Sequence, residues 1–318
     1  MLYSIALLPD PRLYQTTHHT MTEPTLNYVH CPDADEGHRM AYWQWGNPHS
    51  GHVVLCVHGL TRQGRDFDAL AQGLIEKSNG EVRVVCPDVV GRGRSDWLKN
   101  AAAYQLPTYA GDMLALLAQL RPTTLDWVGT SMGGLIGMAV CGTPQLPLPV
   151  PVRRLVLNDV GPVLEWKALS RIGDYLGHTG RFKSVQQAAD LMWTVSSSFG
   201  PHTPEQWLAL SRPMVKALPD GSGDLTLHYD PAIAQPFKQM TEASVPENEA
   251  QLWQLYDQIQ AKTLLVRGAE SDLLSRPTAQ AMTQRGPHAR LIEFAGVGHA
   301  PTFVAADQIA AVASFLLE

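Results

Sequence analysis

The chain has few cysteines, few charges and no long apolar run, and each shortage narrows the class of protein. Its four cysteines are far apart and form no C-x-x-C pair, which argues against a disulfide framework or a cysteine-rich metal site. Cys56 and Cys86 lie in apolar, strand-like runs, so we expect small buried thiols of the kind found in a reducing cytoplasm. No apolar run approaches the ~18 residues of a membrane span, so we expect no membrane partner.

Charge is also scarce. Charged residues make up 17% of the 318 residues, and the net charge of -6 comes without a basic cluster, which excludes nucleic acid as an expected partner. No group of His, Cys and Asp has the spacing of metal ligands, so the sequence predicts neither a metal nor an organic cofactor. A hydrophobic content of 45% is ample for a large core, and we expect a small-molecule substrate.

The first residues differ in composition from the rest. Residues 1–22 are rich in Thr, His and Pro, and we predict a flexible extension there, with Met21 as a second candidate start. The apolar run over 4–8 lacks a basic flank and is cut by Pro9, which makes it a poor signal peptide. We therefore predict a cytoplasmic protein.

Continuous apolar runs alternate with helical periodicity along most of the chain. This alternation predicts an α/β fold with a doubly wound, mostly parallel central sheet and helices on both faces. The expected strands cover 26–31, 39–45, 52–57, 82–86, 125–128, 154–159, 263–268 and 289–294. Between residues 162 and 246 only helical segments are predicted, over 166–176, 185–197 and 205–218. We interpret 23–161 and 247–318 as the core and 162–246 as an inserted helical cap.

A nucleophile elbow stands at the centre of the chain. The run Gly129-Thr130-Ser131-Met132-Gly133 follows an apolar strand and opens a helix of small residues, which is the context that a G-x-S-x-G motif requires. The glycines two before and two after Ser131 allow strand and helix to pass closely. Ser131 is therefore the candidate nucleophile.

The base and the acid are expected at the carboxyl ends of later strands. His299 lies in a Gly-flanked loop directly after the last strand, at the sheet edge where ligands bind in open α/β folds. Asp272 follows the preceding strand, and a carboxylate there can hold the imidazole in the required tautomer. Asp159, at the end of the strand after the elbow, and Glu270 remain alternatives for the acid.

An acyl-transfer site also needs two amide donors for the developing oxyanion. The N–H of Met132 follows the nucleophile, and the loop after the strand over 52–57 carries His58-Gly59-Leu60. We predict the N–H groups of Leu60 and Met132 as the oxyanion donors.

Together these motifs resemble the α/β-hydrolase fold superfamily, in particular its Ser-His-Asp esterases and lactonases with a helical cap. The resemblance covers the chain from about residue 26 to 318 and includes Gly91-Arg92-Gly93-Arg94-Ser95, which implies a structural turn without chemistry. It implies the order serine, acid, histidine and a cap after the strand that follows the elbow helix. Asp272 stands four residues after Gly268, where many relatives have three, which indicates a longer turn.

The residue at the elbow excludes some of the reactions that enzymes of this fold perform. Haloalkane dehalogenases and epoxide hydrolases that resemble this family carry Asp at the elbow, so Ser131 argues against both. Carbon–carbon bond hydrolases of the fold usually show more glycines after His-Gly, where this chain has Leu60-Thr61-Arg62. We predict hydrolysis of a carboxylic ester, thioester or lactone through an acyl-enzyme. A carbon–carbon bond hydrolase and a slow-hydrolysing ligand receptor are the alternatives.

The cap suggests a covered, fairly apolar pocket for a small to medium substrate. Its aromatic residues are Trp166, Trp193, Phe199 and Trp207, although such residues more often serve in packing. Arg62 could meet a substrate carboxylate, but a salt bridge to Asp66 or Asp68 is its more usual role.

Overall fold

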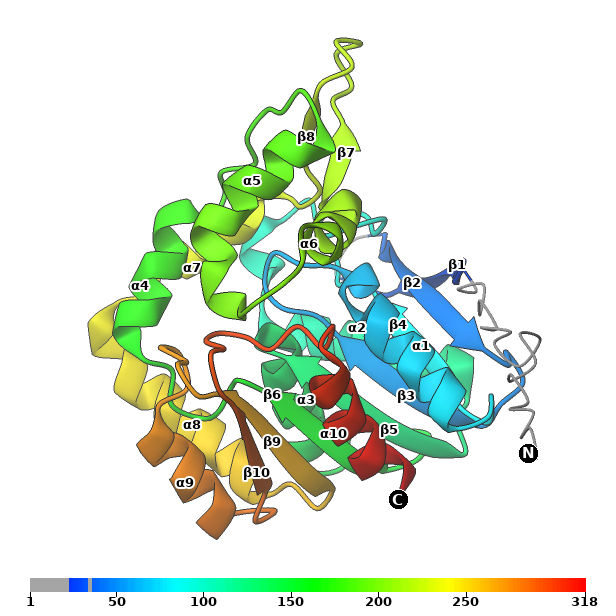
Figure 1. Ribbon diagram of the computed structural model, residues 1–318. Coiled ribbons are helices and arrows are strands. Elements are labelled where there is room, and N and C mark those ends of the chain that lie inside the picture. Colours follow the sequence, from blue (N-terminus) through cyan, green and yellow to red (C-terminus); the bar gives the residue numbers. More distant parts are fainter. Residues whose placement is uncertain (1–22, 34–35) are drawn as a thin grey trace, which may run out of the picture.

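The computed structural model describes residues 23–33 and 36–318, and its centre is an eight-stranded sheet (Figure 1). The strand order is β1-β2-β4-β3-β5-β6-β9-β10. The strands are β1 (Thr25–Cys31), β2 (His38–Gly46), β3 (His52–Val57), β4 (Arg83–Pro87), β5 (Thr124–Thr130), β6 (Val152–Asn158), β9 (Lys262–Gly268) and β10 (Arg290–Phe294). The predicted fold class is confirmed. The predicted extension over 1–22 lies outside the described residues.

The sheet has a parallel part and an antiparallel edge. β1 and β2 pair antiparallel, β2 pairs antiparallel with β4, and the remaining neighbours are all parallel. The parallel strands in the middle read as continuous apolar runs because helices cover both of their faces. Their carboxyl ends meet at one edge of the sheet, where the loops that carry the candidate site begin.

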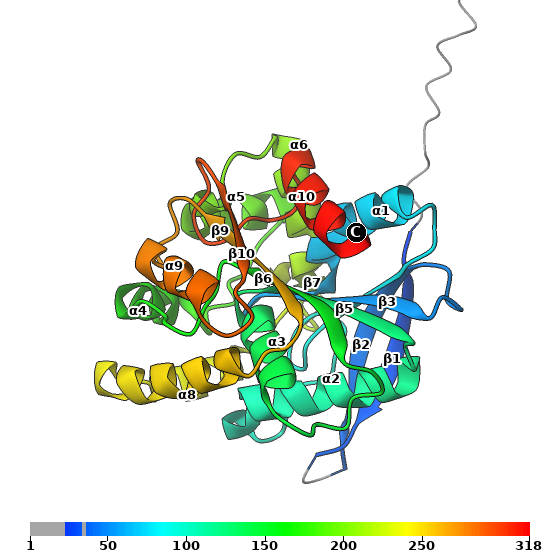
Figure 2. The same cartoon turned by 90° about the horizontal axis from the view of Figure 1, so that it is seen from below.

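Helices cover the two faces of the sheet (Figure 2). The sheet separates the apolar core into two layers. The helices are α1 (Asp68–Lys77), α2 (Leu106–Leu120), α3 (Met132–Gly142), α8 (Val245–Asp257), α9 (Arg276–Gln284) and α10 (Ala306–Leu317). Alternate residues of β3 enter different layers: Val53, Leu55 and Val57 pack toward α2, α3 and α8, whereas Val54 and Cys56 pack toward α1 and α10. This alternation follows from the two-residue repeat of a strand.

The segment 162–246 lies over the carboxyl ends of the parallel strands (Figure 1). It contains α4 (Trp166–Tyr175), α5 (Val185–Ser196), α6 (Pro204–Ser211), α7 (Ala234–Lys238) and a small antiparallel sheet of β7 (Val215–Ala217) and β8 (Leu225–Leu227). The helix predicted over 205–218 is wrong in its second half. α6 ends at Ser211, and the chain passes through Arg212-Pro213-Met214 into β7 because Pro213 lacks the N–H that a continuing helix would need.

α8 was not predicted from the sequence. Its N-terminal turn contains Pro246, and Trp253 and Tyr256 are spaced so that both face α3 and the core. Among the described helices, none is both long and apolar enough to span a membrane.

Candidate active site

The elbow places Ser131 between β5 and α3 in a strained conformation. Ser131 has φ 51 and ψ -115, a backbone conformation that L-residues rarely adopt. A side chain at Gly133 would collide with the carbonyl oxygen of Val57, and one at Gly129 would collide with that of Gly133. The close passage predicted from the two glycines is therefore present. Met132 is the first residue of α3, so its N–H is one of those that lack a partner within the helix.

A hydrogen-bonded chain links Ser131 to a histidine and a carboxylate. The Nε2 atom of His299 lies 3.0 Å from the Oγ of Ser131, and its Nδ1 lies 2.8 Å from Oδ2 of Asp159. His299 stands in the loop after β10, and Asp159 directly follows β6. A hydroxyl, an imidazole and a carboxylate in this order form the arrangement in which histidine takes the hydroxyl proton while the carboxylate fixes its tautomer.

Asp159 is held by more than the histidine. It is fully buried, its Oδ1 accepts a hydrogen bond from the N–H of Gly268 at 2.8 Å, and its Oδ2 accepts one from the hydroxyl of Ser271 at 2.6 Å. The last residue of β9 and the turn that follows it thus supply two donors that orient the carboxylate toward His299. Buried carboxylates of this kind need such donors to offset the loss of water.

Asp272 does not contact His299, and the expectation that it orients the histidine is wrong. After β9 the turn directs Ser271 inward to Asp159 and Asp272 outward, where its Oδ2 lies 2.7 Å from Nη2 of Arg171 in α4. This ion pair is about half exposed and ties the segment 162–246 to the core. Glu270 is also exposed, and its backbone N–H donates to the carbonyl of Val297.

The predicted oxyanion loop is fixed by buried groups. Nε2 of His58 accepts a hydrogen bond from the N–H of Val89 at 2.9 Å, while its Nδ1 donates to the carbonyl of Gly59 at 2.7 Å. Burial lowers the pKa of His58 to about 3, so the ring is neutral at physiological pH and cannot act as a cation in the site. Leu60 follows in the loop and lines the cavity beside Ser131.

Arg92 is a site neighbour that the sequence analysis missed. It is fully buried, and its guanidinium donates to the carbonyl of Leu60 at 2.8 Å and to Sδ of Met132 at 3.4 Å. It also donates to the carbonyl of Val90 and to the hydroxyl of Tyr109. One side chain therefore connects the two residues predicted to supply the oxyanion donors. The feature of the sequence that could have identified Arg92 is its position in the turn Gly91-Arg92-Gly93.

A cavity of about 310 Å³ opens above Ser131 and His299. Its walls come from the core loops and from the segment 162–246, and they are mostly apolar: they include Leu60, Ile172, Met192, Phe199, Met214 and Leu227. The η4 turn (Ser197–Phe199) also contacts the histidine loop, since the hydroxyl of Ser198 donates to the carbonyl of His299 at 3.2 Å.

The aromatic residues of the segment 162–246 serve mainly in packing. Trp193 and Trp207 meet edge to face at a centroid distance of 4.9 Å, Trp166 packs beside Leu169, and only Phe199 of the four lines the cavity. Arg62 also lines the cavity, but its Nε lies 2.6 Å from Oδ2 of Asp66, so the salt bridge predicted for it is confirmed.

Fold and site together define an α/β-hydrolase: a model of the alpha/beta hydrolase family matches residues 54–312, and the chain belongs to this family. The chain is 48% identical to a 3-hydroxybutyrate-oligomer hydrolase of Cupriavidus necator, over 92% of this chain and 97% of that protein. It is therefore a carboxylic ester hydrolase, as the sequence predicted.

Two solved structures share the architecture. An alpha/beta hydrolase from Novosphingobium aromaticivorans superimposes with a TM-score of 0.78 at 32% identity, over 93% of this chain and 99% of that one. An esterase from Mycobacterium tuberculosis superimposes with a TM-score of 0.70 at 22% identity, over 93% of both chains. The second likeness extends to the fold alone.

Proposed function

We propose that this enzyme hydrolyses the ester bonds of short 3-hydroxybutyrate oligomers with Ser131 as nucleophile. The observation that carries the proposal is the chain from Ser131 through His299 to Asp159 at the floor of an apolar cavity. The substrate class is supported by the relative from Cupriavidus necator, which is named for this activity and aligns over nearly its whole length.

Acylation begins when Nε2 of His299 takes the proton of the Ser131 hydroxyl, and the oxygen attacks the ester carbonyl. The N–H groups of Leu60 and Met132 receive the negative charge that develops on the carbonyl oxygen. Asp159 holds the Nδ1 proton of His299 and balances the imidazolium charge without taking the proton itself. The imidazolium then protonates the departing oxygen, which is the hydroxyl of the next 3-hydroxybutyrate unit.

Deacylation repeats these steps with water. His299 accepts a proton from a water molecule, which attacks the acyl-enzyme carbonyl, and the same two amides hold the second oxyanion. Collapse of this intermediate returns the proton to Oγ of Ser131 and releases the carboxylic acid. Each cycle consumes one water molecule and one ester bond and needs no redox partner.

The cavity suits a short polyester. An oligomer of 3-hydroxybutyrate is a methyl-bearing chain whose interior has no charge, and about 310 Å³ lies at the lower end of the range for small-ligand pockets. Leu191 and Val195 of α5 line the cavity and are 55% and 46% exposed, so they form an apolar entrance. We propose that oligomer units outside the acyl site rest on this entrance.

The test is hydrolysis of defined dimers, trimers and tetramers of each 3-hydroxybutyrate enantiomer, with the free acid quantified by chromatography. We expect sustained release for one enantiomer in the wild type and background release in Ser131→Ala. p-Nitrophenyl butyrate serves as the control ester. Cleavage of that ester without cleavage of any oligomer would overturn the substrate and leave the esterase standing. Retained oligomer cleavage in Ser131→Ala would overturn the nucleophile.

The location remains a proposal as well. All four cysteines are free thiols, which supports a reducing compartment, and we keep the cytoplasm as the predicted location.

A further inference from the structure

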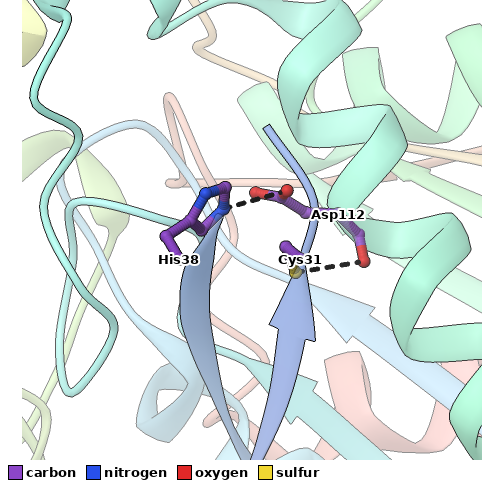
Figure 3. A group of neighbouring side chains, drawn as sticks. All are labelled: Cys31, His38 and Asp112. Carbon is purple, nitrogen blue, oxygen red and sulfur yellow. Dashed lines mark hydrogen bonds and ion pairs between the residues drawn. The ribbon is translucent and has the colours of Figure 1, made fainter. Parts of the chain in front are cut away.

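Three buried side chains at the antiparallel edge of the sheet converge on one point (Figure 3). Cys31 ends β1, His38 begins β2, and the two residues face each other in the strand register. Asp112 reaches them from α2, and the sulfur, nitrogen and oxygen atoms of the three all lie within 4.8 Å of one another. Each of these residues is at most 5% exposed.

One atom of this group lacks a partner among the described residues. Oδ1 of Asp112 lies 3.0 Å from Nε2 of His38, but its Oδ2 is buried and has no hydrogen-bond donor within residues 23–33 and 36–318. The thiol of Cys31 makes a weak contact, at 3.9 Å, with the backbone carbonyl of Asp112. A buried carboxylate oxygen without a partner is costly and calls for an explanation, of which an ion is one.

The opposite side of the histidine ring is held in place. Nδ1 of His38 lies 3.1 Å from Oδ2 of Asp33, whose Oδ1 accepts a hydrogen bond from the N–H of Gly37 at 2.8 Å. A carboxylate on one ring nitrogen fixes the tautomer and directs the other nitrogen to a metal in many metal sites. Here the directed nitrogen is Nε2, which faces Asp112 and Cys31.

We propose that Cys31, His38 and Asp112 bind a zinc ion. A thiolate, an imidazole and a carboxylate are the ligand types that zinc takes, whereas calcium and magnesium prefer oxygen alone. Binding releases the thiol proton of Cys31 and any proton on Nε2 of His38. The thiolate and the Asp112 carboxylate then balance the two charges of the ion, and water completes four-coordination. The ion clips the β1–β2 hairpin to α2.

The same side chains without zinc would be an ion-pair network. In that arrangement His38 is an imidazolium between Asp33 and Asp112, and Cys31 keeps its thiol proton. The two arrangements differ at the sulfur atom, because only a bound metal makes Cys31 a thiolate ligand. The sulfur is therefore the group to measure.

The first experiment is a titration of the full, chelator-treated chain with Co²⁺, followed by absorption spectroscopy. We expect one equivalent of Co²⁺ to produce a thiolate-to-cobalt charge-transfer band in the near ultraviolet, absent in Cys31→Ser and unchanged in Cys141→Ser. An ion bound by histidines elsewhere has no such band. A wild type without the band, or a Cys31→Ser variant that keeps it, would overturn the proposal.

The second experiment is a Zn²⁺ competition assay against a chromophoric chelator. We expect one tight site per chain that is lost in Asp112→Asn, and an affinity about 10–100-fold lower in Asp33→Asn, which removes only the support of His38. Equal affinity in wild type and Asp112→Asn would contradict the ligand set. This measurement does not depend on ester hydrolysis, so it tests the zinc site independently of the proposed function.

Discussion

Two groups of described residues each bring a hydroxyl or thiol, a histidine and a buried aspartate together, and they differ in their surroundings. Around Ser131 the histidine ring bridges a hydroxyl and a carboxylate, and a cavity of about 310 Å³ lies above. Around Cys31 the histidine ring lies between two carboxylates, and Cys31 itself is fully buried. The residue types are nearly the same, but a cavity opens at the group of Ser131, whereas the group of Cys31 is buried.

This difference indicates which features around a side chain are needed for catalysis. Ser131 owes its position to a positive φ at the end of a strand and to the helix terminus that begins with Met132. Cys31 lies in regular antiparallel pairing, with its sulfur enclosed by α2. Backbone strain, open space and a helix N-terminus thus distinguish the proposed nucleophile from the proposed zinc ligand, more than the identity of the residues does.

The largest effect is expected from Ser131→Ala. The variant removes the proposed nucleophile, so kcat should fall by about 10⁶-fold or to the background rate, as for other serine enzymes whose triad acts as a unit. The measurement is the steady-state rate on p-nitrophenyl butyrate, with the thermal unfolding midpoint as the check on folding. A folded variant that retains more than a few per cent of the rate would show that another group performs the chemistry.

Asp159→Asn and Asp272→Asn form a matched pair. An amide at Asp159 no longer fixes the productive tautomer of His299, so kcat should fall by about 10⁴-fold. Asp272→Asn removes only an exposed ion pair with Arg171 and should leave kcat within a few-fold of wild type. Comparable losses in both variants, measured on the same ester, would contradict the assignment of the acid to Asp159.

Arg92→Lys tests the support of the oxyanion donors. Lysine keeps the charge but loses the fork that reaches Leu60 and Met132, so kcat should fall by about 10–100-fold with little change in KM. Arg65→Lys is the matched control, because Arg65 pairs with Asp68 on α1. A change confined to KM would show that Arg92 acts on substrate binding instead.

The last prediction concerns stability alone, through the buried His58. Its pKa of about 3 lies below the ordinary value of 6.5, so between these pH values the unfolded chain binds more protons than the native one. The free energy of unfolding should therefore decrease as pH falls from 6.5 toward 3, by at most about 1.4 kcal/mol per pH unit from this group. His58→Gln should flatten that decrease in urea unfolding, whereas the exposed His49→Gln should not. If the free energy of unfolding depended on pH in the same way in both variants, burial of His58 would not be the cause of the decrease.

The sequence predicted the sheet, the elbow and the histidine because each depends on local pattern. Buried parallel strands appear as apolar runs, and the glycines around Ser131 indicate a close turn. The acid was harder to assign, since β6 and β9 are neighbours and both carry an aspartate near their carboxyl ends. Which carboxylate faces His299 depends on the turn after Gly268, where Ser271 points inward and Asp272 outward.

Long-range contacts explain the remaining misses. Cys31, His38 and Asp112 meet through strand register and helix docking, and their spacing along the chain has no metal-ligand pattern. The turn of Gly91-Arg92-Gly93 marks Arg92 in the sequence, but its contact with the carbonyl of Leu60 joins residues 32 positions apart and depends on the folded arrangement. α8 has polar residues on its exposed side, and its apolar residues toward α3 are too few to show a clear helical periodicity in the sequence.

The most direct test of the central claim is labelling of the native enzyme with a fluorophosphonate, followed by mass spectrometry of the digested chain. The account predicts one adduct per chain, located on Ser131, with a labelling rate that falls sharply in Asp159→Asn and remains near wild type in Asp272→Asn. An adduct on any other residue, or an Asp159→Asn variant that labels as fast as wild type, would contradict it.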